Sequence, residues 1–524
     1  MPGMNFKLTY ASMFDPPESL HQSFEAALSR ISSQPPRDYA LYIDGHDHAS
    51  DVHREKFTPI DRSRLLGRFA EASAGDVQLA VAAAKRAFPL WSRLPAQDRV
   101  HMLRRVAEII AERVYDIAAA LSLEVGKNRL EALAEAQETA DFFEFYGEDF
   151  LKRDFVHDLP DDPLKGFRSR NRSVMKPYGP WAVIAPFNFP FALAAGPVAA
   201  ALATGNTVVL KGATDTPWAG RLLADCIHAA GLPAGVFNYV NGTGSGAGEA
   251  LVKHPDIAGI TFTGSHQVGM GIARNMVAGA VPRPCIAEMG GKNAAIITAR
   301  ADLKRATAGI VRSAFGMGGQ KCSALSRIFV DARVADELTA AVIEATSALT
   351  VGDPTLRQNW LGPVINGTAQ DSYRRYTEML QTGGARVHVG GRTPTDGGLG
   401  DGYYCLPTLA EAPTGHALWQ QEMFLPITML ARVPDRETAM RLVNDSELGL
   451  TAGFFGAEDE VDWFFDNVET GVAYANRPQG ATTGAWPGYQ PFGGWKGSGT
   501  TGKGIASAYY LALYQREQSQ TRVE

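Results

Sequence analysis

Hydrophobic and polar positions follow a helical period over the first third of the chain. Between Asp76 and Tyr146, apolar residues recur every three or four positions, with Arg and Glu between them. This spacing is typical of amphipathic helices that bury one face. Gly126 is expected to end one helix, and the next should run from about Arg129 to Tyr146. The clearest apolar run is Val100, Leu103, Val106, Ile110 and Val114.

From residue 181 onward, short apolar runs alternate with helical segments, which indicates parallel sheets covered by helices on both faces. The first series of predicted strands reads WAVIA (181–185), NTVVL (206–210), VFNYV (236–240) and IAGITF (257–262). A second series begins near Cys285 and contains AAIIT, RIFVD and PITMLAR. The fold class predicted by these two series is α/β, with two domains.

The remaining segments complete the predicted domain organisation. The Arg- and Pro-rich stretch 154–180 breaks the helical pattern and suggests a hairpin that reaches a partner subunit. The tail ends in YYLALY, which we expect to be an edge strand in need of a partner. The assignment is an N-terminal extension (1–36), a Rossmann-like dinucleotide-binding domain (37–153 and 181–287), a catalytic α/β domain (288–479) and a small β oligomerisation element (154–180 and 480–524).

Composition narrows the classes of function. The chain has 524 residues, a formal net charge of -6 and 20% charged residues, so neither nucleic acid nor an anionic membrane is an expected partner. Its four cysteines lie far apart without a CxxC motif, which suggests reduced thiols in the cytoplasm. The first residues contain no apolar core of a targeting signal. The uncharged stretch 181–210 is divided by prolines and predicts a buried soluble unit. We expect no metal site.

Two glycine loops are candidates for binding a dinucleotide. NGTGSGAG (241–248) contains Gly242 and follows a predicted strand, but no acidic residue stands about 20 positions further on to hold a ribose. FTGSHQVG (262–269) places Gly264 and Ser265 before a predicted helix, where a backbone N–H and a hydroxyl can meet a phosphate. Each loop alone could be an ordinary strand–helix turn, and their presence together favours a dinucleotide.

Three further residues suggest chemistry at a carbonyl group. Cys322 follows three glycines in GMGGQKCSAL, and the positive charge of Lys321 beside it would favour the reactive thiolate. Glu288 ends an apolar strand, where partial desolvation should raise its pKa toward that of a general base; pairing with Lys292 is the structural alternative. Asn188 lies between prolines, and its amide could stabilise an oxyanion or simply complete a turn. A Cys–His protease has no support from nearby sequence.

These motifs, taken in order, resemble the aldehyde dehydrogenase superfamily over about residues 40 to 515. The matching segments are Pro186–Phe187–Asn188–Phe189–Pro190, Thr263–Gly264–Ser265, Glu288–Met–Gly–Gly–Lys, Gly–Gln–Lys–Cys322, Glu422–Met–Phe424–Leu–Pro426 and Pro491–Phe492–Gly493–Gly494.

The resemblance implies NAD(P)-dependent oxidation of an aldehyde to a carboxylic acid. Cys322 would add to the aldehyde, Asn188 and the Cys322 N–H would hold the oxyanion, and Glu288 would activate the water that releases the acid. The cofactor-binding residues implied by the resemblance are Phe187, Lys211, Thr214, Gly242, Gly264, Ser265, Glu422 and Phe424.

Two departures from the family pattern bear on the cofactor. Lys211–Gly212–Ala213–Thr214 lacks the glutamate that grips the ribose hydroxyls in relatives, so NAD is favoured while NADP stays open. Leu425 stands where the family has glycine, which would narrow the nicotinamide pocket.

Within the superfamily, GQKCSA and GYQPFGGWKGSGTTGK are similar to the Δ1-pyrroline-5-carboxylate (L-glutamate γ-semialdehyde) dehydrogenases of proline breakdown. The resemblance implies that Ser323 binds the substrate carboxylate and that Glu138 lies near the substrate amine. Gly504 and Ala506 would complete the carboxylate site, although Ile505 replaces an expected glycine.

Other functions stay open at this point. A broad aliphatic or aromatic aldehyde dehydrogenase is the first alternative, because several aromatic residues could line the tunnel. A reductase of acyl phosphates or thioesters would not need Glu288, and a binding protein that has lost catalysis would not need Cys322, Asn188 or Lys211. The expected partners are a small-molecule aldehyde and further copies of the chain, in a homodimer or a higher even oligomer.

Overall fold

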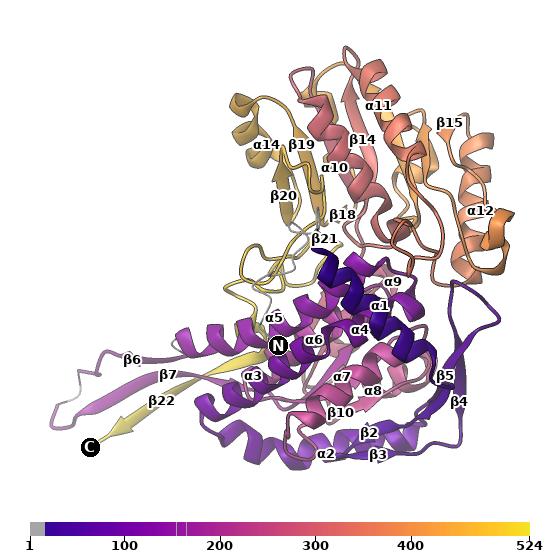
Figure 1. The fold of residues 1–524 in the computed structure, drawn as a ribbon. Coiled ribbons are helices and arrows are strands. Elements are labelled where there is room, and N and C mark those ends of the chain that lie inside the picture. Colours follow the sequence, from indigo (N-terminus) through magenta and orange to yellow (C-terminus); the bar gives the residue numbers. More distant parts are fainter. Residues whose placement is uncertain (1–15, 154, 164) are drawn as a thin grey trace.

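The computed structural model describes residues 16–153, 155–163 and 165–524. It has two bodies and an arm (Figure 1). The lower body holds one seven-stranded sheet, the upper body holds another, and a three-stranded sheet extends from the lower body as the arm. The predicted α/β class with two sheet-containing domains is confirmed.

The sheet of the lower body has the order β12-β11-β8-β9-β10-β2-β3. The five strands β12 to β10 pair in parallel, and β2 and β3 add antiparallel strands at one edge. Chain order reverses between β8 and β11, which creates the type of crevice where open α/β sheets bind ligands. The strands are β2 (Leu41–Ile43), β3 (His46–His48), β8 (Pro180–Ile184), β9 (Thr207–Lys211), β10 (Phe237–Val240), β11 (Gly259–Thr263) and β12 (Cys285–Glu288).

Both faces of this sheet are apolar because helices cover both of them. Alternate residues of a strand point to opposite faces: Trp181 and Val183 pack in one core cluster, and Ala182 packs in another. The helices on the first side are α3 (Ala96–Glu112), α4 (Val114–Val125), α5 (Arg129–Lys152), α6 (Ala192–Ala203) and α7 (Pro217–Ala229); those on the second are α2 (Ala74–Arg93), α8 (Glu249–Lys253) and α9 (His266–Ala278).

The sheet of the upper body has the order β15-β16-β17-β14-β13-β19-β20, and only β15 is antiparallel to its neighbour. Its strands are β13 (Asn293–Ile297), β14 (Leu325–Asp331), β15 (Arg386–Val389), β16 (Thr408–Glu411), β17 (Ile427–Val433), β19 (Thr451–Phe455) and β20 (Val472–Ala475). The helices around it are α10 (Leu303–Phe315), α11 (Ala335–Ser347), α12 (Gly367–Thr382), α13 (Arg436–Asn444) and α14 (Val461–Asn467).

Part of the predicted N-terminal extension is an integral helix. Helix α1 (Glu18–Ser32) packs on α4 and buries Leu20, Phe24 and Ala27 in the core of the lower body. Burying a large apolar side chain contributes about 1.5–3 kcal/mol, so α1 is firmly attached. A small sheet of β1 (Arg37–Tyr39), β5 (Leu65–Ala70) and β4 (His53–Phe57) lies beside it in the chain. Residues 1–15 of the extension lie outside the described residues.

The arm corresponds to the predicted hairpin. Strands β6 (Val156–Leu159) and β7 (Ser169–Pro177) pair antiparallel, and β22 (Gln515–Val523) pairs with the full length of β7. YYLALY was expected to be the edge strand, and that prediction is wrong. Its last four residues form the 3-10 helix η6 (Leu511–Tyr514), because Tyr510 and Tyr514 both turn inward and are fully buried. The strand starts only at Gln515.

Among the described helices, none has both the length and the apolar character needed to span a bilayer.

Candidate active site

The predicted catalytic and cofactor-binding residues lie at the carboxyl ends of strands of the lower sheet and just before strands of the upper sheet. Asn188 follows β8, Lys211 ends β9 and Ser265 follows β11, so three of them border the crevice where strand order reverses. Glu288 ends β12, and Cys322 lies just before β14 of the upper sheet. The site therefore forms where the two bodies meet.

Two cavities open from this junction. We call them cavity A, of about 620 Å³, and cavity B, of about 370 Å³. Cys322 lines both of them. A molecule in either cavity therefore lies against the same residue, Cys322.

Cavity A collects most of the residues that were predicted to bind a cofactor. Gly242 is the exception: it does not line the cavity, although its carbonyl accepts a hydrogen bond from the Thr214 hydroxyl at 3.0 Å. Gly244 and Gly248 of the same loop do line it. The predicted residues in its wall are Phe187, Asn188, Lys211, Thr214, Gly264, Ser265, Cys322, Glu422 and Phe424.

The start of α9 is suited to a phosphate group. Ser265 is its N-cap residue, and no side chain caps the helix. The first N–H groups of a helix carry partial positive charge, which favours an anion. A Cβ on Gly264 would lie 2.5 Å from the ring of Phe262, so only glycine allows the loop to pass so close to it. This end of cavity A fits the pyrophosphate of a dinucleotide.

Polar side chains suited to ribose hydroxyls lie in cavity A at the end of β9 and just after it. Lys211 Nζ is 3.4 Å from the Thr214 hydroxyl, and burial lowers the pKa of this ammonium to about 8. Asp215 also lines the cavity, and it accepts a hydrogen bond from Asn366 at 3.3 Å. The chain thus offers a hydroxyl and an ammonium group here, with a carboxylate close by.

Glu422 is held in place by a glycine pair. The Gly291 N–H donates to its carboxylate at 3.0 Å, and a Cβ on Gly290 would lie 2.0 Å from Glu422 Oε2. Glycine is thus required at position 290 for the Glu422 carboxylate to contact the backbone of this loop. Burial raises the pKa of Glu422 to about 7, and Lys292 acts in the opposite direction.

The loop that carries Cys322 has an unusual backbone. Met317, Gly318 and Gly319 all have positive φ angles of 53°, 63° and 68°. For a side chain as large as methionine this conformation is strained, and such strain is found mainly at functional sites. A Cβ on Gly319 would lie 2.1 Å from the Leu425 carbonyl oxygen, so the Cys322 loop packs directly on the loop of Glu422 and Phe424.

Lys321 does not supply the positive potential that the sequence suggested. Its ammonium is 3.0 Å from Glu131 Oε1 on α5, and both side chains are largely buried. Gly316 makes room for the pair, since a Cβ there would lie 2.9 Å from Lys321 Nζ. Burial raises the pKa of the Cys322 thiol to about 12, and Glu422 and Glu288 act in the same direction. The pair ties the Cys322 loop to the lower body.

Glu288 has the environment that the sequence predicted for it. It is 9% exposed, and burial raises its pKa well above the usual value. Its Oε2 has no hydrogen-bond partner among the described residues, and neither has Lys292 Nζ, so the alternative of a Glu288–Lys292 pair is not observed. The carboxyl group is therefore available to accept a proton once it ionises.

Asn188 presents its amide group to cavity A. It is 3% exposed and lies in the loop between β8 and α6. Its Oδ1 accepts the Phe189 N–H at 3.1 Å, which directs the Nδ2 group away from that bond. An NH₂ group fixed in this way is a suitable donor to an oxyanion.

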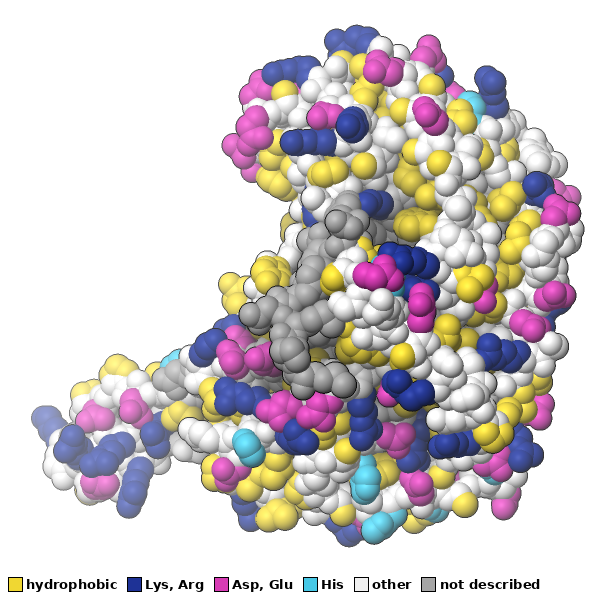
Figure 2. Space-filling model, in the orientation of Figure 1, with side chains coloured by type: hydrophobic (Ala, Val, Ile, Leu, Met, Phe, Trp, Pro, Cys, Tyr) yellow, Lys and Arg dark blue, Asp and Glu magenta, His cyan; other side chains and the backbone are white. Residues whose placement is uncertain are grey.

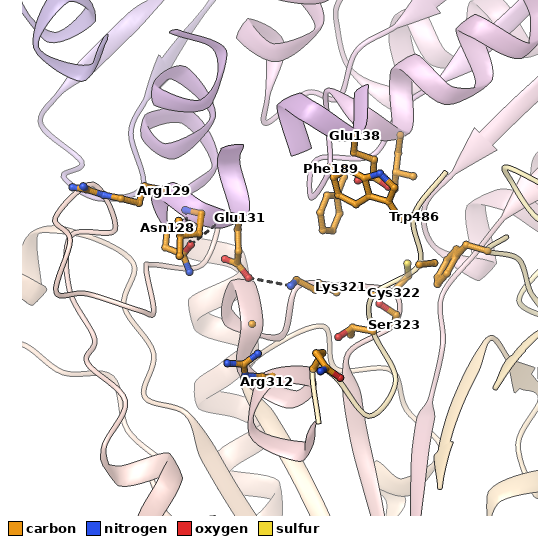
Figure 3. Close-up of a pocket in the computed structure, with 18 of the residues that line it drawn as sticks. Asn128, Arg129, Glu131, Glu138, Phe189, Arg312, Lys321, Cys322, Ser323 and Trp486 are labelled. Atoms are coloured by element: carbon orange, nitrogen blue, oxygen red, sulfur yellow. Dashed lines mark hydrogen bonds and ion pairs between the residues drawn. The ribbon is translucent and has the colours of Figure 1, made fainter. Parts of the chain in front are cut away.

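Cavity B contains the residues that were predicted to bind substrate, with one exception. Glu138, Ser323 and Ala506 line it together with Trp486 and Cys322 (Figure 3). Gly504 does not line it. A Cβ on Gly504 would lie 2.6 Å from the Phe492 carbonyl carbon, so its backbone packs on Phe492 instead.

Sequence analysis missed Gly484 and Ala485, which line cavity B beside Trp486. Gly484 has a φ angle of 122°, and its N–H has no backbone or side-chain acceptor among the described residues. The only available signal was a glycine in the TTGAW segment, within a tail that contains many glycines.

The described residues contain no cluster of three or more His, Cys, Asp or Glu that could hold a metal ion.

The chain is similar to proteins of known activity along nearly its whole length. A family model for the aldehyde dehydrogenase family matches residues 47–518. The 1-pyrroline-5-carboxylate dehydrogenase of Geobacillus kaustophilus is 37% identical over 508 residues, a match that covers 96% of this chain and 96% of the relative.

Solved structures agree with this similarity. The 1-pyrroline-5-carboxylate dehydrogenase from Thermus with bound NAD has a TM-score of 0.92 and 32% identity, with 100% of both chains covered. The betaine aldehyde dehydrogenase of Staphylococcus aureus in complex with NAD⁺ has a TM-score of 0.88 and 26% identity, and covers 95% of this chain and 97% of that one.

Proposed function

Because this chain belongs to the aldehyde dehydrogenase family, we propose that it oxidises an aldehyde to a carboxylic acid through a covalent intermediate on Cys322. The proposed substrate is L-glutamate γ-semialdehyde, the open-chain form of 1-pyrroline-5-carboxylate, and the product is L-glutamate. The observation that carries this proposal is that Cys322 alone among the proposed catalytic residues lines both cavities. It can thus meet an aldehyde from one side and a cofactor from the other.

The residues around Cys322 suit the steps of this reaction. After the Cys322 thiol has lost its proton to solvent, the thiolate adds to the carbonyl carbon, and the new oxyanion accepts hydrogen bonds from the Asn188 amide and the Cys322 N–H. Bound NAD supplies the acceptor for the hydride that leaves this carbon. Glu288 then takes a proton from the water that attacks the resulting thioester, and the Cys322 sulfur leaves as the acid is released.

Cavity A supports NAD as the cofactor. The start of α9 would hold the pyrophosphate, Glu422 would hold one ribose, and Lys211 and Thr214 would hold the other. The neutral hydroxyl of Thr214 does not repel a 2′-phosphate, whereas the Asp215 carboxylate in the same cavity would oppose one, so NAD is the favoured cofactor. NADP remains an additional cofactor in this proposal.

Cavity B supports a zwitterionic substrate. The Glu138 carboxylate suits an ammonium group, and the Ser323 hydroxyl and the Gly484 N–H suit a carboxylate. These groups lie in the cavity that also exposes Cys322 (Figure 3). The name of these relatives, 1-pyrroline-5-carboxylate dehydrogenase, supports the same substrate.

The function is tested by adding purified protein to NAD and glutamate semialdehyde, beside propanal and benzaldehyde, and following the absorbance of NADH. Glu138→Gln should raise KM for the semialdehyde about 10-fold or more, because a charge-assisted hydrogen bond contributes about 1.5–3 kcal/mol. The KM for propanal, which has no ammonium group, should stay unchanged.

An equal rise in KM for propanal would show that Glu138 acts only on the shape of the cavity. Turnover of propanal or benzaldehyde without turnover of the semialdehyde would reject the proposed substrate but not the chemistry. No turnover of any aldehyde would reject the proposed function.

A second candidate is an aldehyde dehydrogenase for less polar substrates. Much of the lining of cavity B is apolar, and the side chain of Trp486 is fixed in it by a hydrogen bond from Nε1 to Asp141 at 2.8 Å. Preference for benzaldehyde in the same experiment would favour this candidate. The other apolar lining residues include Phe142, Phe189, Leu193 and Ile505.

We also infer that the protein acts in the cytoplasm and forms a homodimer or a higher even oligomer. Strand β6 is the edge strand of the arm and is exposed along its whole length, and an exposed edge strand favours pairing with another chain. Figure 2 shows Lys and Arg side chains at the far end of the arm. Sedimentation velocity at micromolar concentration should give a mass at least twice the 56.4 kDa of one chain, and a monomer would contradict the inference.

A further inference from the structure

A buried ion pair lies under the loop that carries Asn188. Lys127, between α4 and α5, contacts the carboxylate of Glu135 on α5 through Nζ, and both side chains are 0% exposed. Removing two charges from water is unfavourable, and well-packed apolar side chains are often at least as stable. Neither residue lines cavity A or cavity B. The pair therefore calls for an explanation other than direct contact with substrate.

Glu135 holds the start of helix α6. Its Oε1 accepts the N–H groups of Phe191 at 2.9 Å and of Ala192 at 3.2 Å. Phe191 is the N-cap residue of α6 and has no side-chain oxygen to satisfy these donors. A carboxylate from α5 thus takes the place of the missing cap and joins the two helices.

Lys127 holds the residue next to Asn188. Its Nζ lies 3.7 Å from the centre of the Phe189 ring, a distance at which an ammonium group is attracted to the ring face. The Phe189 N–H in turn donates to Asn188 Oδ1. The position of Phe189 therefore decides where the Asn188 amide points.

We propose that Lys127 and Glu135 are positioning residues, which hold the segment from Asn188 to Ala192 so that the Asn188 amide meets the oxyanion. The inference rests on the oxyanion role proposed above for Asn188. Glu135 fixes the end of the segment at α6, Lys127 fixes Phe189, and the ion pair fixes Lys127 and Glu135 to each other. Small displacements of a reacting geometry can lower a rate about 10²-fold.

The test is a double-mutant cycle between Lys127→Met and Asn188→Ala, measured as kcat for aldehyde oxidation. Lys127→Met alone should lower kcat about 10- to 100-fold, with NAD affinity and the alkylation rate of Cys322 unchanged. When Asn188→Ala is already present, Lys127→Met should cause little further loss, because the amide that it positions is gone. A purely structural role would give losses that multiply.

Glu135 provides a second arm that avoids the single Lys127→Met variant, in which the Glu135 charge would be buried without its partner. Glu135→Gln keeps an oxygen acceptor for the Phe191 and Ala192 N–H groups, whereas Glu135→Ala does not. The double variant Lys127→Met with Glu135→Gln removes both buried charges and keeps these hydrogen bonds. It should retain more kcat than Glu135→Ala, and this comparison decides the case if Lys127→Met does not fold.

Glu124→Gln is the matched control. Glu124 is also a buried carboxylate that accepts two N–H groups at a helix start, those of Trp218 at 2.7 Å and Ala219 at 2.9 Å on α7. No hydrogen bond or ion pair among the described residues joins Glu124 to the Asn188 loop, so any loss that this variant causes should multiply with that of Asn188→Ala.

The outcomes separate the two proposals. If Asn188→Ala leaves kcat unchanged, the oxyanion role fails and the inference falls with it. If Asn188→Ala lowers kcat but the losses from Lys127→Met multiply with it, or Lys127→Met retains full kcat, the inference alone is overturned. A cycle in which the second loss disappears supports it.

Discussion

Replacing Cys322 by alanine is expected to abolish aldehyde oxidation while leaving the protein folded. The proposed reaction needs a covalent bond from this sulfur before the hydride can leave, and removal of a catalytic nucleophile lowers kcat by about 10⁴-fold or more. The side chain lines two cavities and is only partly buried, so its loss should create little new void in the core. The measurement is NADH formation from the aldehyde, together with a thermal unfolding curve.

Cys285→Ala is the matched control for this prediction. Cys285 is partly buried on β12 and lines neither cavity, so this variant should oxidise the aldehyde at the normal rate. A folded Cys322→Ala protein that still oxidises aldehydes at an undiminished rate would contradict the covalent mechanism.

Replacing Glu288 by glutamine is expected to stop the reaction after its first half. The thioester should form and release NADH, but its hydrolysis needs a base, and loss of a general base lowers the rate about 10²- to 10⁴-fold. Rapid mixing should therefore show a burst of about one NADH per active site, followed by slow turnover. A variant with no burst and no turnover would show that Glu288 acts before the thioester forms.

The pH dependence of thioester hydrolysis should also distinguish the unsubstituted protein from the Glu288→Gln variant. Burial raises the pKa of Glu288 well above its usual value, so the carboxyl group ionises at a higher pH than a free glutamate does. Only the ionised form can take a proton, so hydrolysis in the normal protein should accelerate as the pH rises toward that pKa. In Glu288→Gln this acceleration should be absent.

The sequence was sufficient for the fold class because local patterns carry that information. The alternation of short apolar runs with helical segments predicted the two parallel sheets, and the ordered motifs predicted the family. The prediction of a strand at YYLALY was wrong because its three tyrosines have high strand propensity, whereas burial of Tyr510 and Tyr514 against the core decides the conformation of the segment. Tertiary packing of this kind leaves no local signature.

The site was predictable where residue type and chemistry are tightly linked. A cysteine after three glycines and a glutamate at the end of an apolar strand were both identified from sequence, although their catalytic roles remain predictions. The ion pair between Lys321 and Glu131 was not identified from sequence, because the two residues are 190 positions apart. Gly484 was missed because its contribution is a backbone N–H, which every residue except proline possesses.

Cys322 borders two separate cavities, and this arrangement bears on the order in which substrate and cofactor bind. An aldehyde that binds in cavity B would not have to pass a cofactor bound in cavity A. The acid could leave through cavity B while the reduced cofactor is still bound. Neither the acid nor the cofactor would block the exit of the other. Substrate and cofactor could therefore bind, and the two products leave, in more than one order.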